Sequence, residues 1–278
     1  MFSRARGLES GVARRRRRRR AKIRLIISVV LAVVLIGGAL VISRLDAIRI
    51  ERVYPSGTIL LKEEEVMAIA REAIAGSYLY IFPKNNIFIY PRTDIKNTLL
   101  RSYPELSDVS VSFRDFKSIS INISERKSQA LWCLGDYLGA LSESKCYLSD
   151  EHGLVFRDAS GLENGSLIRF FGGIEGEPIK KTILPAEEFL TTLAFVERLK
   201  QAGLSVVVIS LEEGGVRKGG LLSGGDIIWN ANEDLENALK NLELLLASSG
   251  FKGRDKSGNL SVSYIDIQNV NKIFYKAK

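Results

Sequence analysis

Histidine and cysteine are scarce in this 278-residue chain, which has one histidine, His152, and two cysteines, Cys133 and Cys146. No Cys-x-x-Cys pair occurs, so neither composition nor spacing favours a metal site. We therefore predict no metal and no other cofactor. The 46% hydrophobic and 26% charged residues are ordinary for a globular protein. That composition excludes a wholly disordered chain, a collagen and a small disulfide scaffold.

An excess of positive over negative charge is found at only one end of the sequence. Residues 1–24 carry eleven of the 40 Lys and Arg residues and one of the 32 acids, whereas residues 25–278 carry 29 bases and 31 acids. The body of the protein is therefore nearly neutral. A nucleic-acid-binding domain would need basic residues clustered in its folded part, so we predict no nucleic-acid partner.

Long uncharged runs are absent but for one, LIISVVLAVVLIGGALVIS at 25–43. As a helix it would measure about 28 Å at ~1.5 Å per residue, close to the ~30 Å hydrocarbon core of a bilayer. A cleaved signal peptide would have a shorter apolar region and a small-residue cleavage site. The run is longer than that and ends without an A-x-A pattern, so we predict a retained transmembrane helix.

The distribution of bases around this run predicts its orientation. Eleven bases precede it, and the next twenty residues hold four, namely Arg44, Arg49, Arg52 and Lys62. Loops rich in Lys and Arg stay in the cytoplasm. We therefore expect residues 1–24 to be a cytoplasmic tail and 44–278 to be exported. The run Arg14–Arg20 would also suit nucleic acid, but beside a span it favours topology and contact with anionic lipid.

The region 46–125 has the pattern strand, helix, helix, strand, strand. Alternating apolar residues predict the strands, and apolar residues at helical spacing predict the helices. Val111 is placed in the core on this reasoning, and a turn is expected at Pro55-Ser56-Gly57. The expected elements are a strand at 47–53, helices around 66–74 and 95–103, and a hairpin of strands at 109–113 and 119–123.

Residues 126–278 predict a larger, β-rich domain with two helices, so the fold class is α+β. Short apolar segments separated by turns indicate strands, and helices are expected at 185–203 and 235–250. Trp132 is placed in the core. Cys133 and Cys146 lie in two strand-like segments, and export makes a disulfide between them chemically possible. Two buried thiols remain the alternative.

Several segments together resemble the FtsQ/DivIB family of bacterial division proteins. The region 46–125 is similar to a POTRA domain. Ser124-Glu125-Arg126 followed by Ala130-Leu131-Trp132 is similar to the family's E-R-x-P-x-A-x-W segment, with Ser128 where proline is usual. Tyr264-Ile265-Asp266-Ile267 resembles its terminal Y-[VI]-D-L motif, and Gln268 stands where many members have Arg.

The resemblance implies four segments and a function. The segments are a cytoplasmic tail (1–24), a transmembrane helix (25–43), a POTRA domain (46–125) and a β domain of the FtsQ/DivIB type (126–278). The function implied is a non-enzymatic, single-pass scaffold at the division septum. It would hold other bitopic division proteins, similar to FtsB/DivIC and FtsL, with septal wall synthases as further candidate partners and no small-molecule substrate.

A partner is expected to add a strand at the C-terminal end of the chain, because nothing follows to cover a sheet edge there. We place this edge at 261–268. The predicted partner-binding residues are Ser261, Ser263, Tyr264, Ile265, Asp266, Ile267, Gln268, Ile273, Phe274 and Tyr275.

Two other functions are weighed. A membrane-anchored cell-wall enzyme or regulator would need a convergent catalytic set. Ser142 and Lys145 match S-x-x-K, but the accompanying S-D-N and K-T-G elements are absent from the sequence. His152 lies in an Asp-Glu-His-Gly context that predicts a solvated turn, and the pair Glu187-Glu188 predicts solvated surface. A POTRA-bearing export or chaperone component would be favoured by tandem POTRA domains, and the sequence predicts one.

Overall fold

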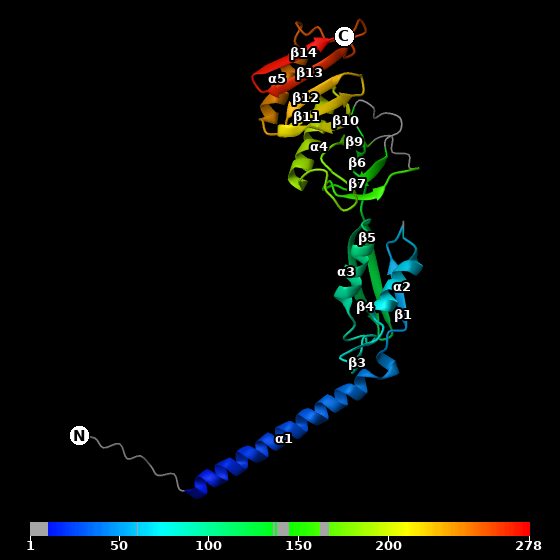
Figure 1. The fold of residues 1–278 in the computed structure, drawn as a ribbon, viewed down its shortest axis with the longest axis vertical. Helices are drawn as coiled ribbons and strands as arrows, with labels where there is room; N and C mark the ends of the chain where they lie inside the picture. Colours follow the sequence, from blue (N-terminus) through cyan, green and yellow to red (C-terminus); the bar gives the residue numbers. More distant parts are fainter. Residues whose placement is uncertain (1–10, 60, 136, 138–144, 162–166) are drawn as a thin grey trace, which may run out of the picture. The chain divides into compact units, whose positions relative to one another are not determined.

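The computed structural model describes residues 11–59, 61–135, 137, 145–161 and 167–278. These residues form two compact units. The first contains the chain up to Ser102 and Asp108–Ser124, and the second contains Tyr103–Ser107 and Glu125–Lys278. Figure 1 shows a mixed α+β protein with one long N-terminal helix and a large β-rich unit. The predicted α+β class is confirmed at this level.

The N-terminal helix α1 runs from Gly11 to Ser43. Its portion Arg19–Ser43 has a mean hydropathy of 3.1 over its most apolar window. The large apolar side chains described between Ile23 and Ile36 are exposed, whereas Leu40 is half-buried and Ser43 is buried where the helix ends. α1 is therefore long and apolar enough to cross a membrane.

The first unit continues with a three-stranded sheet and two helices. The sheet has the order β1-β5-β4, with β1 parallel to β5. Val66 and Ala70 of one helix and Ile95 and Leu99 of the other are buried. The elements are η1 (Asp46–Ile48), β1 (Arg52–Ser56), α2 (Glu63–Ala73), β2 (Ser77–Tyr78), β3 (Phe82–Pro83), α3 (Arg92–Ser102), β4 (Leu106–Asp115) and β5 (Ser118–Glu125).

Two expectations for this unit are wrong. The first strand begins at Arg52, not at 47, because the backbone of Ile48 and Ile50 bonds to the segment 85–87 instead of to the sheet. It also runs through the expected turn, since β1 is an edge strand and an edge tolerates Pro55.

The buried part of β4 is also shorter than expected. Val109 is fully buried, but Val111 is half-buried and Phe113 is exposed. The three residues share one face of the strand, and burial declines along it towards the β4–β5 turn. Alternation alone identifies the face but not the point at which its covering ends.

The second unit is built on one nine-stranded sheet of order β14-β13-β12-β11-β10-β9-β6-β7-β8. The predicted strands and both helices are present. The elements are β6 (Ala130–Cys133), β7 (Cys146–Ser149), β8 (Val155–Asp158), β9 (Ile168–Phe171), α4 (Ala186–Gln201), β10 (Val206–Leu211), η3 (Glu213–Gly215), β11 (Val216–Leu221), β12 (Asp226–Asn230), α5 (Leu235–Ala247), β13 (Val262–Asn269) and β14 (Lys272–Ala277).

The two helices of this unit contribute to the same core. Phe189 and Leu199 of α4 and Leu239 of α5 share it with Trp229 and Ile265 of the sheet. A smaller cluster that includes Leu131, Phe156 and Val208 forms separately. Trp132 is buried as predicted, and its indole Nε1 donates a hydrogen bond to the carbonyl oxygen of Gly172 at 2.8 Å.

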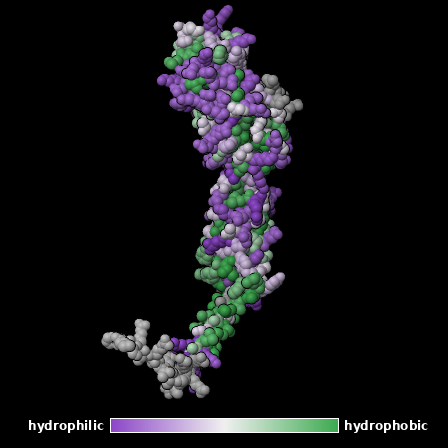
Figure 2. Space-filling view, turned by 60° about the vertical axis from the view of Figure 1, so that its left-hand side comes forward, coloured by the Kyte–Doolittle hydropathy of each residue, from purple (hydrophilic) through white to green (hydrophobic). Residues whose placement is uncertain are grey.

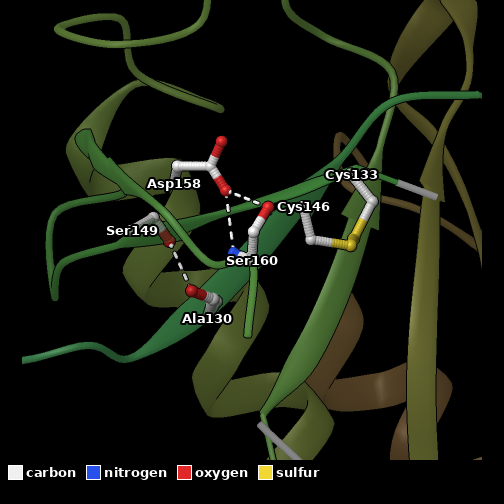
Figure 3. The surroundings of a disulfide bond; sticks show 6 residues. All are labelled: Ala130, Cys133, Cys146, Ser149, Asp158 and Ser160. Carbon is white, nitrogen blue, oxygen red and sulfur yellow. Dashed lines mark hydrogen bonds between the residues drawn. A yellow bond between two sulfur atoms is a disulfide. The ribbon is translucent and has the colours of Figure 1, made fainter. Parts of the chain in front are cut away.

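The structure joins Cys133 and Cys146 in a disulfide between the paired strands β6 and β7 (Figure 3). The two residues lie directly opposite each other in the antiparallel register. Nearby, the hydroxyl and backbone N–H of Ser160 donate to Asp158 and lower the pKa of that carboxyl. The Cys133–Cys146 disulfide closes the β6–β7 connection into a loop and so restricts the unfolded chain.

Removing the disulfide is expected to destabilise the second unit. A Cys133→Ala/Cys146→Ala variant should lose about 3 kcal/mol of unfolding free energy, the value for a loop of this size. Urea unfolding followed by tryptophan fluorescence measures this, because both tryptophans of the chain, Trp132 and Trp229, lie in this unit. Adding a reductant should weaken the wild type and leave the variant unchanged. Equal stability of the two oxidised proteins would contradict the prediction.

Candidate partner-binding surface

The C-terminal strand β14 forms one edge of the nine-stranded sheet. β13 lies inside it, parallel to β12 on one side and antiparallel to β14 on the other. The predicted edge at 261–268 is therefore wrong. The turn at Asn269–Asn271 is short enough to fold the last strand back onto β13, which satisfies the backbone groups of β13 that were expected to be open.

The open backbone groups belong to alternate residues of β14. Lys278 donates its N–H to the carbonyl oxygen of Ser261 at 3.1 Å, so this N–H points towards β13. Both register shifts between the strands lie on β13, and β14 is regular. By the period of two, the N–H groups of Lys276 and Phe274 also point inwards, and those of Ile273, Tyr275 and Ala277 point out of the sheet.

The predicted partner residues divide between two faces of these strands. Ile265 and Ile267 are buried in the core, and Ile273 and Tyr275 pack partly against it. The Tyr275 ring lies 4.9 Å from that of Phe251. The side chains of Ile265 and Ile267 are therefore closed to a partner, whereas those of Ile273 and Tyr275 support the sheet and stay partly exposed. Ser261, Ser263 and Gln268 are half-buried.

The opposite face carries the exposed members of the set. Tyr264 is 36% exposed and Phe274 is 57% exposed. The strand register places Asp226, Tyr264 and Lys276 in one row across β12, β13 and β14. We call this surface the open face, and its residues are Asp226, Ile228, Tyr264, Asp266, Phe274 and Lys276.

Polar contacts fix the carboxylates of the open face. Asp266 accepts hydrogen bonds from the backbone N–H of Gln268 at 3.0 Å and from its side-chain Nε2 at 3.1 Å. Asp226 lies 3.2 Å from Lys218 Nζ and accepts the hydroxyl of Tyr137. Burial and then the hydrogen bond to Asp226 raise the pKa of Tyr137. With their charges satisfied locally, the aromatic rings of Tyr264 and Phe274 are the main apolar groups available for contact.

Sequence reasoning missed Asp226, Ile228 and Lys276. The alternation of residues 264 to 268 and 274 to 276 carried part of the signal, because side chains two apart share a face. Which of the two faces is exposed depends on the side of the sheet against which α5 packs, and the alternation does not report this. Asp226 and Ile228 join the face because β12 pairs with β13, two strands that are far apart in the sequence.

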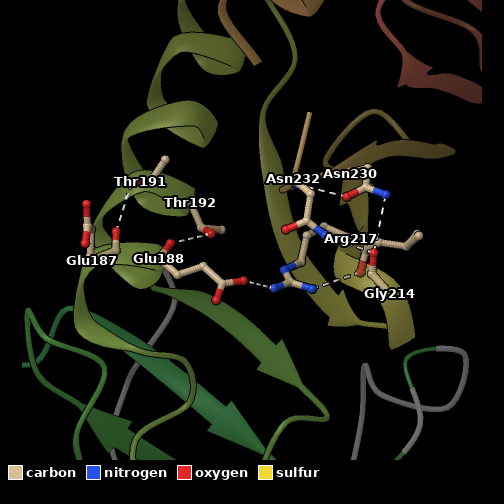
Figure 4. A network of polar contacts seen from close by, with 9 residues as sticks. Glu187, Glu188, Thr191, Thr192, Gly214, Arg217, Asn230 and Asn232 are labelled. Atoms are coloured by element: carbon tan, nitrogen blue, oxygen red, sulfur yellow. Dashed lines mark hydrogen bonds and ion pairs between the residues drawn. The ribbon is translucent and has the colours of Figure 1, made fainter. Parts of the chain in front are cut away.

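An ion pair between a buried arginine and a half-buried glutamate lies on the opposite, helix-covered side of the sheet (Figure 4). Arg217 on β11 is 4% exposed and its guanidinium donates to Glu188 on α4. It also donates to the carbonyl oxygen of Val216 at 3.1 Å. The expected solvated acidic surface is present at Glu187, which is exposed, and only in part at Glu188, which is half-buried in the ion pair. This contact ties a helix to the sheet.

Lys145 and His152, the described residues among those considered for catalysis, make other contacts. Ser142 of the S-x-x-K match is outside the described residues, and Lys145 lies 3.3 Å from Asp158. His152 is exposed in a turn, and its backbone N–H donates to Asp150 Oδ1 at 2.9 Å. Within the part of the chain that the structure describes, no three His, Cys, Asp or Glu side chains gather as metal ligands would.

Arg126, from the first of the two segments that resemble the family, forms an ion pair with Asp150 at the start of the second unit. Asp150 accepts from the guanidinium of Arg126 and from the backbone N–H groups of His152 and Leu154. Arg126 Nε donates to the carbonyl oxygen of Pro104 at 3.0 Å. The Arg126–Asp150 pair thus holds three chain segments together, which is a structural role.

Comparison with models of known protein families gave no match, and a search of curated proteins also gave no match.

Proposed function

We propose that this protein is a non-enzymatic, single-pass membrane scaffold of the bacterial division machinery, of the FtsQ/DivIB type. Its N-terminal tail would lie in the cytoplasm and both compact units outside. The first unit would be a POTRA domain, and the second would hold FtsB/DivIC-like and FtsL-like division proteins at the septum. In this role it links assembly of the machinery to septal wall synthesis.

The open edge of β14 beside the open face is the observation that carries the proposal. A partner strand added at this edge would bond to the outward backbone groups of Ile273, Tyr275 and Ala277 and would cover Phe274. α1 would place this surface near a membrane, which raises the effective concentration of partners that are themselves membrane-anchored. The order strand, helix, helix, strand, strand of the first unit supports its assignment as a POTRA domain.

Binding assays with substitutions on β14 test the proposal. Ala277→Pro removes an outward N–H at an edge that tolerates proline, so the β13–β14 bonds remain. Phe274→Ala removes an exposed ring from the open face. Each change should weaken binding of FtsB/DivIC-like and FtsL-like proteins about tenfold. The measurement is the affinity of the full chain in detergent for each partner.

A matched control is Leu222→Ala, which removes an exposed apolar side chain from the β11–β12 turn. It should bind like the wild type, and all three variants should melt at the wild-type temperature. Wild-type binding by both folded β14 variants would show that the partner contact lies elsewhere. Absence of a fluorescent fusion from the septum of dividing cells would overturn the division role.

The proposed orientation gives a separate prediction. A reporter that is active only in the cytoplasm, fused after Lys278, should be silent. Replacing Arg14–Arg20 with neutral residues should mix the orientation and make part of the population bright, because the Lys and Arg bias would fall. A bright wild-type fusion would contradict the assignment, and a reporter fused at the N-terminus is the control for expression.

A further inference from the structure

One end of the first unit lies beside the C-terminal end of α1. Asn86 Nδ2 donates to the carbonyl oxygen of Ser43, the last residue of the helix, at 3.0 Å. The N–H of Ile87 donates to the carbonyl oxygen of Ile48 at 3.0 Å, and that of Glu51 donates to Lys117 at 2.8 Å. The segment 77–90 and the β4–β5 turn are therefore held where α1 ends, and Figure 1 shows β3 close to that point.

This end carries large apolar side chains that the described part of the unit leaves exposed. Leu79 is 83% exposed, Tyr80 97% and Phe88 66%, and Phe113 and Phe116 are also exposed. The ring of Phe116 lies 6.4 Å from that of Phe88 and 5.8 Å from that of Phe113. We call these five residues the apolar end. In Figure 2 the hydrophobic surface of α1 continues onto the adjoining part of this unit.

The backbone directs two of these residues outwards at a cost. Leu79 and Tyr80 have φ values of 49° and 61°, in the left-handed region that side chains other than glycine rarely adopt. They form the tip of the β2–β3 hairpin, in which Tyr78 pairs with Phe82. A strained tip with two exposed apolar side chains gains nothing in water, and such strain is typical of positions that contact something else.

We propose that the apolar end inserts into the interfacial region of the lipid bilayer that α1 crosses. This rests on membrane insertion of α1, and not on the division role. The carbonyl group of Ser43 lies within hydrogen-bond distance of Asn86, so the apolar end is placed at the level where the span leaves the hydrocarbon. Aromatic side chains are enriched at that level because their rings sit among the lipid headgroups.

The charges around the apolar end suit lipid rather than a protein core. Arg44 follows the span directly, and Arg49 and Lys117 flank the patch in exposed ion pairs with Asp46 and Glu51. Asp46 and Glu51 offset Arg49 and Lys117, so Arg44 leaves the surroundings weakly basic, and the exposed apolar side chains carry the proposed contact with lipid. The first unit would then be fixed against the bilayer at two places, by α1 and by the apolar end.

Spin-label accessibility on the full chain, reconstituted in vesicles of phosphatidylglycerol and phosphatidylethanolamine, tests the proposal. Leu79→Cys and Phe88→Cys provide the labelling sites, and the disulfide leaves Cys133 and Cys146 unreactive. Oxygen concentrates in lipid, whereas a water-soluble nickel chelate is excluded from it. The ratio of oxygen to nickel relaxation should be several-fold higher at both sites than at Ile59→Cys. Ile59 is an exposed apolar residue just past the opposite end of β1.

Three outcomes would overturn the proposal. Ratios at positions 79 and 88 equal to that at position 59 would place the apolar end in water and leave it for a protein partner. Dipolar broadening between labels would show that a second copy of the chain covers it. A flexible linker inserted directly after Ser43 would break its contact with Asn86 and free the apolar end from α1. An equally high ratio in that variant would show that the labels themselves partition into lipid. With the linker, the ratio should instead fall towards the control value.

Discussion

Replacing Asp150 with alanine is expected to lower the unfolding free energy of the second unit by about 3–5 kcal/mol, the usual cost of removing one partner of a buried ion pair. The Asp150 side chain is 5% exposed, and that of Arg126 is 23% exposed. Without the carboxylate, the guanidinium of Arg126 and the N–H groups of His152 and Leu154 lose their acceptor. Buried donors left unpaired are the main source of the loss.

A matched substitution in the neighbouring strand separates this effect from the loss of any acid. Asp158 also pairs with a base, Lys145, and accepts from Ser160, but the side chains of Lys145 and Asp158 are 55% and 40% exposed. Asp158→Ala should therefore cost far less, because water replaces the lost contacts. Asp150→Asn should lie between the two, since an amide oxygen can still accept from the backbone. Urea unfolding followed by tryptophan fluorescence ranks the three variants.

If Asp150→Ala unfolds at the same urea concentration as Asp158→Ala, the Arg126–Asp150 pair does not hold the start of the second unit. The assay reports this unit because it contains both tryptophans. Circular dichroism of the native state should match the wild type for all three variants, which shows that the comparison is between folded proteins.

Val109→Asp is the second change with a large expected effect. Val109 is fully buried on β4, so the new carboxylate would be desolvated without a partner and should cost several kcal/mol. Val111→Asp is the matched control, because it makes the same change two residues along the same face of the strand, where the side chain is half-buried. Its cost should be much smaller, since its carboxylate can reach water.

Thermal melting by circular dichroism distinguishes these two variants. The first unit contributes to this signal, and the tryptophans do not lie in it. We expect Val109→Asp to lose the part of the transition that belongs to the first unit and to keep the tryptophan transition. Val111→Asp should stay near the wild type. Equal shifts for the two variants would show that the burial of this strand does not decline between Val109 and Val111.

The sequence predicted most elements because their signals are local. The uncharged run 25–43 needs no partner to be recognised, since its length and composition are those of a span. The helices α4 and α5 follow from apolar residues at helical spacing, and β4 and β5 follow from alternation. The failure at β1 has a tertiary cause, because Ile48 and Ile50 alternate like strand residues but bond to the segment 85–87.

For the C-terminal strands and the cysteines, too, some features follow from the sequence and others from tertiary structure. The sequence by itself determined that a strand-rich end carries exposed and buried residues in alternation, and it made a disulfide between Cys133 and Cys146 chemically possible. Tertiary structure decided that β13 is interior and β14 is the edge, that Cys133 faces Cys146, and that Phe274 rather than Ile265 is exposed. Side-chain period reports which residues share a face, but the exposure of a face or an edge depends on which strand or helix packs against it from elsewhere in the chain.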